Sequence, residues 1–315
     1  MKTKASEIAK ILLNAKAVAV IGHVDPDGDC LGSMYALTLA LQALGKTAVP
    51  LLKKPIPIKH RNFSDLLFPN SEAPKNCDLV VILDTPEEKR QDFKNAELPS
   101  VPKICIDHHQ GLHADYDAAF YQEDAPATVL LILALLHELK VTITPKIAEA
   151  LYVGLLTDTN AFTNGNTTPE VFKAALELTE SGANPGKIAS LVYQSRTPFE
   201  IATLAKVLGT LETYCEEKIA VLSMPYEWQK NNPPCDTELF VNFARSLKDS
   251  EIAVMLIGTE EGTRVNLRSK GEADVSLAAK AIGGGGHRAA AGCRLNVPLA
   301  EAKIQVLEAL KKYSL

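Results

Sequence analysis

The sequence has no apolar run long enough to cross a membrane. The longest run, Ala127 to Leu136, is far shorter than the ~20 residues that a membrane-spanning helix needs, and polar residues follow it at once. The first residues, Met1 to Lys16, spread lysines among apolar residues and lack the apolar core and small-residue cleavage site of a secretory signal. We therefore expect a buried helix at 127–136 and a cytoplasmic protein with no membrane partner.

Paired cysteines and an excess of basic residues are also missing. The six cysteines never form a Cys-x-x-Cys pair, which in a chain without a sign of export predicts reduced, mostly buried thiols. Lys and Arg number 33 against 38 Asp and Glu, a formal net charge of -5. Because binding to long nucleic acids relies on a broad excess of cations, we expect a nucleic-acid substrate to be short, and no long duplex as a partner.

The chain has no repeat or low-complexity segment, and its 46% hydrophobic content is typical of a globular protein. Its length favours two domains. The first half alternates β-branched runs with helical patterns, which predicts an α/β domain with a mostly parallel sheet flanked by helices. We expect this domain at 1–185, a helical linker at 186–215 and a smaller α+β domain at 216–315, with an active-site cleft between the two domains.

The expected strands are short β-branched runs at 18–21, 79–83, 103–106, 219–222, 252–257 and 263–267. The expected helices lie at 31–44, 127–139, 145–156, 169–180, 187–193, 199 to about 214, 275–281 and 299–313.

Polar residues directly follow the first three strands. His23 to Asp29 follow the first, Asp84 the second, and Asp107 to His109 the third. Because ligands in open α/β sheets bind beyond the carboxyl ends of the strands, we expect these side chains at one edge of the sheet. Two adjacent histidines behind an aspartate are unusual there, whereas Asp158, at the end of an apolar helical run, taken alone also fits a plain helix end.

The segment from His23 to Asp29 contains one histidine and three carboxylates. So many acids repel one another unless cations neutralise them, and imidazole together with carboxylates suits Mn²⁺ or a similar divalent ion. Asp-Pro-Asp-Gly is also an ordinary turn sequence, so this segment alone leaves both interpretations open.

These motifs resemble a known family. His-x-x-x-Asp-x-Asp, a lone Asp, Asp-His-His and a late Asp, in this order, are similar to the motifs of the DHH phosphoesterase superfamily. Gly283 to Gly292, with the sequence GGGGHRAAAG, resembles the glycine-rich motif of the associated DHHA1 domain. With both halves matched, nearly the whole chain is similar to the NrnA-type nano-RNase subfamily.

The resemblance implies two bound divalent cations. Mn²⁺ is the expected ion, and Mg²⁺ and Co²⁺ are the alternatives. One cation would be held by three side chains, those of His23, Asp27 and Asp84. The other would be held by four, those of Asp29, Asp84, His108 and Asp158, with Asp84 bridging both. A pair of cations lowers the pKa of a shared water and clamps the attacking and leaving oxygens at phosphorus, so we expect a bridging hydroxide as the nucleophile.

Three further residues receive roles from the resemblance. Asp25 and Asp107 would orient ligands through hydrogen bonds. His109 would face the substrate and either touch the phosphate or protonate the leaving oxygen. We take His109, Asp84 and Asp25 as the catalytic residues.

The last third of the chain carries a candidate phosphate site. Strand alternation places the polar residues of the segment 264–270 on one face. Four successive glycines leave backbone N–H groups to approach an anion, and the next two side chains add donors. The expected substrate-binding residues are Arg264, Asn266, Arg268, Gly284, Gly285, Gly286, His287 and Arg288. A solvated strand face is the alternative.

The chain departs from the family pattern near the expected substrate. Gln110 stands close behind Asp-His-His, where relatives carry an asparagine, and Asn160 and Thr163 replace the usual Gly and Arg after Asp158. We expect an enzyme that hydrolyses oligoribonucleotides of a few nucleotides to 5′-mononucleotides and also dephosphorylates adenosine 3′,5′-bisphosphate to AMP.

Several alternatives stay open. They are a phosphodiesterase for cyclic or linear dinucleotides such as c-di-AMP, pApA or pGpG, an exonuclease for longer substrates, a family II pyrophosphatase, and a non-catalytic nucleotide sensor or scaffold. A sensor predicts lost metal ligands, and all six positions are present. The expected partner is short single-stranded RNA or a small nucleotide, and either a homodimer or a monomer fits the sequence.

Overall fold

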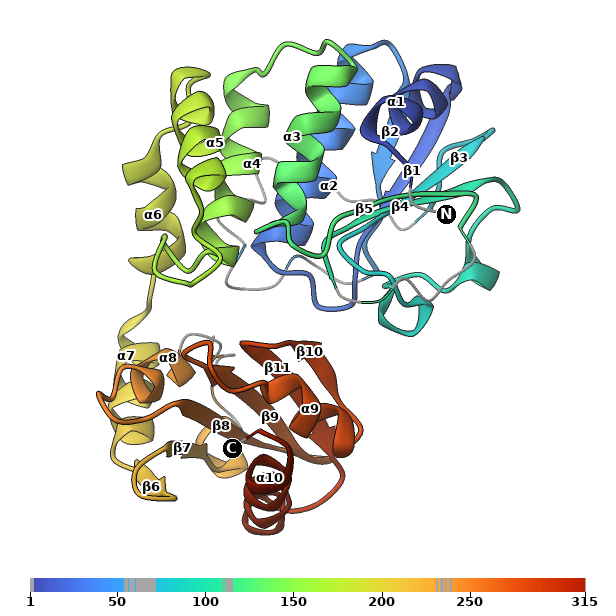
Figure 1. Cartoon of the computed structure of the whole chain (residues 1–315). Coiled ribbons are helices and arrows are strands. Elements are labelled where there is room, and N and C mark those ends of the chain that lie inside the picture. Colours follow the sequence, from blue (N-terminus) through green and yellow to red (C-terminus); the bar gives the residue numbers. More distant parts are fainter. Residues whose placement is uncertain are drawn as a thin grey trace. The chain divides into compact units, whose positions relative to one another are not determined.

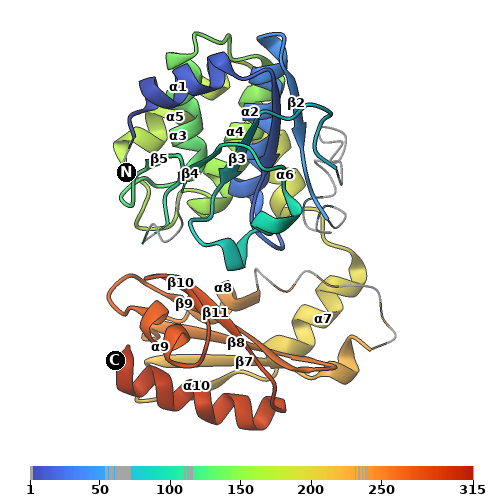
Figure 2. The same cartoon turned by 90° about the vertical axis from the view of Figure 1, so that its right-hand side faces the viewer.

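The computed structural model describes residues 3–314 except 54–55, 57–59, 61–71, 110, 112–115, 231, 233–234, 236 and 238–239. Gln110, one of the departures from the family pattern, thus lies outside the described residues. The chain forms two compact units, Met1–Ser195 and Arg196–Leu315 (Figures 1 and 2). Among the described residues, no helix has the length and apolar character needed to span a membrane. The predicted linker limits, 186 and 215, stay a prediction.

The first unit is built on a parallel five-stranded sheet in the order β2-β1-β3-β4-β5. Its strands are β1 (Ala17–Ile21), β2 (Thr47–Pro50), β3 (Leu79–Leu83), β4 (Lys103–Asp107) and β5 (Ala118–Tyr121). β1 and β3 are buried along their whole length, which explains why both are unbroken apolar runs. The three strands predicted in this half are confirmed, whereas the short edge strands β2 and β5 were not predicted.

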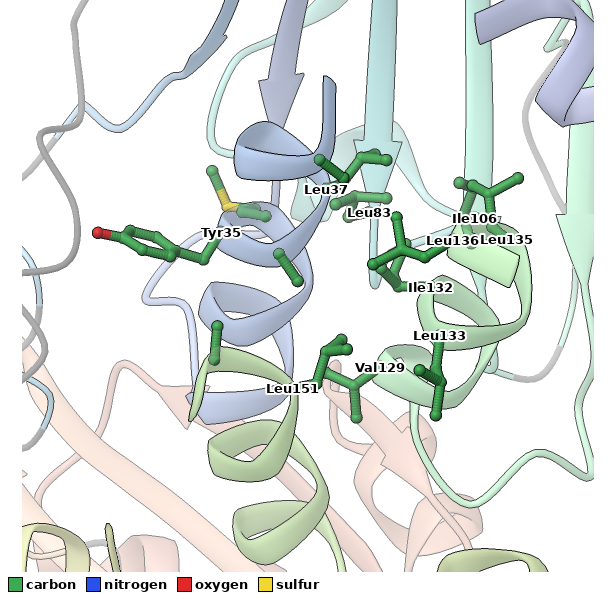
Figure 3. Close-up of a cluster of buried hydrophobic side chains, with 14 of the residues drawn as sticks. Tyr35, Leu37, Leu83, Ile106, Val129, Ile132, Leu133, Leu135, Leu136 and Leu151 are labelled. Atoms are coloured by element: carbon green, nitrogen blue, oxygen red, sulfur yellow. The ribbon is translucent and has the colours of Figure 1, made fainter. Parts of the chain in front are cut away.

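The helices of this unit lie on one side of the sheet, some packed on the sheet itself and the others packed on those helices. They are α1 (Ala5–Asn14), α2 (Gly28–Ala43), α3 (Thr128–Glu138), α4 (Pro145–Asp158), α5 (Pro169–Glu180) and α6 (Pro185–Tyr193). Figure 3 shows Leu83 of β3 and Ile106 of β4 beside the leucines of α3, in one buried cluster. The other face contacts Phe93 and Leu98, from the segment that contains the 3₁₀ turns η2 (Glu88–Arg90) and η3 (Asn95–Glu97).

The strand order places a topological switch point between β1 and β3. From β1 the chain first passes through α2 to β2 on one side, and β3 then pairs on the other side of β1. At such a switch point the connections leave in opposite directions, and ligands bind beyond the carboxyl ends of the two strands. The residues that follow β1 and β3 therefore meet in this place.

Two glycines allow α2 and α4 to approach closely. A Cβ on Gly32 of α2 would lie 2.4 Å from the carbonyl oxygen of Ala150 in α4. A Cβ on Gly154 would lie 2.4 Å from Cγ1 of Val129 and 3.0 Å from Oδ1 of Asp29. Only glycine fits at both positions, so the first turn of α2 is held against α4.

The second unit is a mixed six-stranded sheet in the order β10-β11-β9-β8-β7-β6, in which only β7 and β8 are parallel neighbours. Its strands are β6 (Glu212–Tyr214), β7 (Ile219–Met224), β8 (Ile252–Thr259), β9 (Gly262–Ser269), β10 (Gly285–His287) and β11 (Ala290–Leu295). Two helices, α9 (Val275–Ala281) and α10 (Leu299–Tyr313), pack on one face. The other face is covered by α7 (Pro198–Leu208) and α8 (Phe240–Arg245), and η4 (Tyr226–Trp228) follows β7.

One predicted helix is wrong at its C-terminal end. The helix expected from Phe199 to about Tyr214 ends at Leu208, with Gly209 as its C-cap. The following residues form β6, which pairs antiparallel with β7. Thr213 and Tyr214 are strand-favouring residues. Pairing with the edge of β7 therefore stabilises a strand here more than continuation of the preceding helix would.

The close contact between α2 and α4 can be tested by Gly32→Ala. The added methyl group meets a backbone carbonyl and cannot be relieved by a side-chain rotation, so we expect a loss of about 1–3 kcal/mol in the free energy of unfolding. Gly186→Ala in α6 is the matched control, because the nearest atom to its Cβ lies 3.6 Å away and a small gain is expected there. Urea denaturation followed by far-UV circular dichroism measures both, and equal stability of Gly32→Ala and wild type would contradict the close contact.

Candidate metal centre

The polar residues after the first three strands come together with the end of α4. The side chains of His23, Asp29, Asp84 and His108 are each less than 10% exposed. Asp84, which is 1% exposed, lies at their centre. The expectation that these strand ends share one edge is confirmed by the parallel pairing of β1, β3 and β4.

The first group of ligand atoms lies around one oxygen of Asp84. Nε2 of His23 is 3.5 Å from Oδ2 of Asp84 and 3.8 Å from Oδ1 of Asp27. Nδ1 of His23 lies 2.9 Å from the carbonyl oxygen of Val24. When Nδ1 carries the proton and donates it to this carbonyl, the lone pair of Nε2 points at the two carboxylates.

The second group surrounds the other oxygen of Asp84. Nε2 of His108 is 3.6 Å from Oδ1 of Asp84 and 3.8 Å from Oδ2 of Asp29. Ligand atoms of Asp29, His108 and Asp158 lie within 4.8 Å of one another. The Nδ1 atom of His108 lies 2.9 Å from the carbonyl oxygen of Ala125, so this histidine also turns Nε2 toward acids.

The local sequence explains how these groups are held. Asp27 is the N-cap of α2, and its Oδ1 accepts hydrogen bonds from the amides of Asp29 and Cys30, both at 3.0 Å. Asp84 has a φ of 59° and Asp25 a φ of 52°, in the left-handed region that aspartate tolerates better than most residues. Such backbone strain is concentrated at functional sites.

The charges in this cluster shift the pKa values of its members. Burial raises the pKa of Asp158 to about 7, with Asp27 and Asp84 also raising it against the opposing effect of His108. Burial alone would lower the pKa of His108, but the carboxylates of Asp158, Asp84 and Asp29 raise it to about 10. Burial and the neighbouring carboxylates also raise the pKa of Asp29. The cluster therefore holds protons that a bound cation would displace.

The donor set fits a pair of divalent cations. Two imidazole nitrogens and four carboxylates form two groups that share Asp84, and carboxylate with imidazole suits Mn²⁺ and related ions. The two groups are those implied by the family resemblance, and the assignment of each residue to an ion stays a prediction.

The other residues predicted in this unit differ in their surroundings. Asp107, the last residue of β4, is fully buried, and its Oδ1 lies 2.8 Å from Nδ1 of His109. Its Oδ2 is buried and makes no hydrogen bond within the described part of the chain. His109 lies 3.6 Å from Asp84, close enough to act beside the cluster, whereas Asp25 is exposed.

Sequence reasoning missed two residues of the cluster. Oγ1 of Thr128 donates a hydrogen bond to Oδ1 of Asp84 at 2.8 Å, although in the sequence Thr128 is only one residue of an apolar run. Cys30 is fully buried, with its Sγ within 4.8 Å of ligand atoms of His23 and Asp84. Burial raises the pKa of Cys30 to about 11, so it stays a thiol at neutral pH.

In the second unit, the predicted alternation along β9 is present. Arg264, Asn266 and Arg268 are half-buried on one face, and the residues between them are buried. Lys270 lies beyond the end of β9. Burial lowers the pKa of Arg245, a residue that sequence reasoning missed, and the like charge of nearby Arg268 lowers it further. Two neighbouring guanidinium groups favour an anionic ligand.

The glycine run has a packing role that the sequence did not reveal. A Cβ on Gly284 would lie 2.2 Å from the carbonyl oxygen of Gly292, and one on Gly286 would lie 2.5 Å from that of Ala290. The amides of Gly283 and Gly284 donate to carbonyls at the end of α9, so these two amides already have partners within the unit. The guanidinium of Arg288 donates to the carbonyl oxygen of Glu272 at 2.7 Å.

Gly285 is unlike its neighbours, since a Cβ there would meet no atom within 4 Å. His287, half-buried, ends β10. Substrate binding by these residues stays a prediction.

The raised pKa values predict that metal binding depends on pH. A cation binds imidazole and carboxylate only after they lose their protons. Lowering the pH below about 7 protonates Asp158 in addition to His108, so the apparent affinity for Mn²⁺ should fall as the pH falls. Calorimetric titration at about pH 6 and about pH 8, in buffers of different ionisation enthalpy, would measure affinity and proton release together. An affinity that is independent of pH, without proton release, would contradict this electrostatic description.

Comparison with known proteins assigns this chain to one family. Residues 17–155 match the DHH family, N-terminal domain, and residues 216–314 match the DHHA1 domain. The chain is 33% identical over 308 residues to the bifunctional oligoribonuclease and PAP phosphatase NrnA of Thermus thermophilus, covering 94% of this chain and 89% of that protein.

Two solved structures share the fold. An exopolyphosphatase-related protein from Bacteroides fragilis has a TM-score of 0.87 at 25% identity, covering 98% of this chain and 96% of that chain. RecJ from Thermus thermophilus, in complex with Mn²⁺, has a TM-score of 0.56 at 18% identity, covering 98% and 54%, and shows the fold alone. The chain therefore belongs to the DHH family, with an N-terminal DHH domain followed by a DHHA1 domain.

Proposed function

We propose that this protein is a metal-dependent phosphoesterase that hydrolyses short oligoribonucleotides to 5′-mononucleotides and dephosphorylates adenosine 3′,5′-bisphosphate to AMP. The observation that carries the proposal is the convergence of five predicted ligand side chains on the sixth, Asp84, in two groups on its two oxygens. Four carboxylates packed this closely with two imidazoles are unfavourable without cations, and no such cluster is needed for a purely structural role.

Two divalent cations, with Mn²⁺ as our first choice, would be held by His23, Asp27 and Asp84 and by Asp29, Asp84, His108 and Asp158. When bound, such a pair activates a water and neutralises charge on the phosphate. Imidazole together with carboxylate ligands supports Mn²⁺ as the first choice, and Mg²⁺ or Co²⁺ are the alternatives.

His109 is proposed to protonate the leaving oxygen or to bind the phosphate. The hydrogen bond between Nδ1 of His109 and Asp107 fixes the orientation and tautomer of the ring. We therefore propose Nε2 as the ring nitrogen of His109 that meets the substrate. Asp107, which has no contact with solvent, acts through His109, and Asp25 is proposed to orient ligands from its exposed position.

The proposed substrate rests on the second unit, the overall charge and the relative from Thermus thermophilus. The face of β9 with Arg264, Asn266 and Arg268, reinforced by Arg245, suits the phosphate of one nucleotide. The net charge of -5 disfavours long nucleic acids. A relative that is 33% identical over 94% of this chain carries the name of an oligoribonuclease and PAP phosphatase, which supports the same two substrates here.

Cleavage by the metal centre can be tested with Asp84→Asn. The change keeps the size of the side chain but removes the negative charge that both metal-binding groups share. We therefore expect kcat on an RNA dinucleotide with Mn²⁺ to fall by more than about 100-fold. This loss is larger than the one usually seen when only a hydrogen-bond partner of a metal ligand is removed. Asp249→Asn, an exposed change in the second unit, is the control and should retain full activity. Equal turnover by Asp84→Asn and wild type would refute the site.

The same assay should include a panel of RNAs of increasing length, cyclic and linear dinucleotides, adenosine 3′,5′-bisphosphate and pyrophosphate. The highest kcat/KM is expected on the shortest RNAs. Activity that rises with RNA length, or that is confined to cyclic dinucleotides or pyrophosphate, would overturn the proposed substrate but leave the metal centre intact.

The phosphate site in the second unit predicts a different kinetic effect. Arg268→Gln should raise KM for the dinucleotide about tenfold or more, because a hydrogen bond to a charged group contributes about 1.5–3 kcal/mol. Its Mn²⁺ affinity should stay at the wild-type value, since its unit contains none of the proposed ligands. Lys311→Gln, which removes one positive charge from the exposed end of α10, is the matched control. A wild-type KM in Arg268→Gln would contradict substrate binding by this face of β9.

A further inference from the structure

The segment that leads into α3 contacts three of the proposed ligands. The carbonyl oxygen of Ala125 lies 2.9 Å from Nδ1 of His108. The amides of Thr128 and Val129 donate to the two carboxylate oxygens of Asp29, at 2.7 and 2.9 Å. The hydroxyl of Thr128 donates to Asp84 at 2.8 Å. This short segment therefore makes hydrogen bonds to both the first turn of α2 and the loop after β3.

Asp29 caps α3 from another part of the chain. Ala127, the N-cap of α3, has no side chain that can accept from the amides of the first turn, and such amides need a partner. The carboxylate of Asp29 supplies it, at the end of the helix where negative charge is favoured. Both oxygens of Asp29 are thereby fixed in direction, and Oδ2 also faces His108.

The two oxygens of Asp84 face different groups. Oδ2 is 3.5 Å from Nε2 of His23, whereas Oδ1 is 3.6 Å from Nε2 of His108. A carboxylate turns easily about its terminal bond, since torsions of this kind have broad energy wells. The hydroxyl of Thr128, which is fully buried, donates to Oδ1 of Asp84 and not to Oδ2. It therefore favours the rotation of the carboxylate in which Oδ1 faces His108 and Oδ2 faces His23.

We propose that Thr128 is a positioning residue for the bridging ligand: its hydroxyl holds the Asp84 carboxylate in the rotation that directs one oxygen to each metal-binding group. The inference rests on the proposed function and adds to it a residue outside the set of ligands. Thr128 does not touch the substrate. It acts through Asp84, in the way that hydrogen-bond partners of metal ligands set the ligand direction.

A positioning role and a merely structural role make different predictions. If Thr128 only begins α3, its loss lowers stability and leaves the metal affinity of the folded protein unchanged. If it orients Asp84, its loss weakens the binding of the metal itself, before any substrate is present.

The test uses the full chain with Thr128→Val, which keeps the shape and removes the hydroxyl, and Thr128→Ser, which keeps the hydroxyl. Mn²⁺ binding is measured without substrate by electron paramagnetic resonance, and thermal unfolding is measured in a chelator. Thr128→Val should bind Mn²⁺ about 10 to 100 times more weakly and lose kcat with an unchanged KM, whereas Thr128→Ser should recover both.

The matched control is Thr38→Val in α2. Thr38 is also buried, but its hydroxyl donates to the carbonyl oxygen of Met34 within the same helix. Thr38→Val should keep the wild-type Mn²⁺ affinity. If Thr128→Val does not fold, Thr128→Ala replaces it, because the smaller side chain cannot clash.

Three outcomes overturn the inference. They are wild-type Mn²⁺ affinity in Thr128→Val, equal losses in Thr128→Val and Thr128→Ser, and a wild-type protein that binds no Mn²⁺. A wild type that binds Mn²⁺ but cleaves no RNA contradicts the proposed substrate alone, and the binding measurement then still decides the role of Thr128.

Discussion

The burial of the Asp84 carboxylate is the constraint on which the rest of the first unit depends. A carboxylate removed from water needs charged or hydrogen-bonding partners on every side, and Asp84 receives them from three directions. His23 comes from the loop after β1, His108 and His109 from the end of β4, and the hydroxyl of Thr128 from α3. Burial raises the pKa of Asp84, but these histidines together bring it below its usual value, so the group stays ionised and able to bind a cation.

This arrangement requires helices and strands to meet at close range. Gly32 and Gly154 allow α2 and α4 to touch, and this contact brings Asp29 near Asp158. The amides at the start of α3 bind Asp29 and connect the third helix to the same point. The backbone thus brings together residues that are far apart in the sequence. The apolar cluster shown in Figure 3 packs α2, α3 and α4 against one another and against the sheet.

The sequence could predict those site residues that lie in short motifs at the ends of strands. His23, Asp84 and His108 directly follow apolar runs, and parallel strands bring their carboxyl ends to one edge. Thr128 could not be found in this way, because an isolated threonine in an apolar run has no local signal for a hydrogen bond to a residue 44 positions away. The glycines of 283–286 were ambiguous for a related reason, since close packing and anion binding favour the same residue.

The fold was predictable to a similar limit. The buried strand β3 is a continuous apolar run, and α5 and α10 show the apolar spacing of a helix over their whole length. The bounds of these three elements agree with the prediction. The short strands β2, β5 and β6 form by pairing with the edge of a neighbouring strand, and their own sequences do not show that this edge is available.

The two departures from the family pattern after Asp158 lie in one left-handed turn and bond each other. Asn160, Ala161 and Phe162 have successive φ values of 48°, 55° and 63°, a left-handed turn in which the family pattern places glycine. Asparagine is the residue that best tolerates this region after glycine, and its Nδ2 donates to Oγ1 of Thr163 at 2.7 Å. The hydroxyl of Thr163 in turn donates to the carbonyl oxygen of Asn160. The side chains of the two replacing residues, Asn160 and Thr163, therefore support each other across the left-handed turn that follows Asp158.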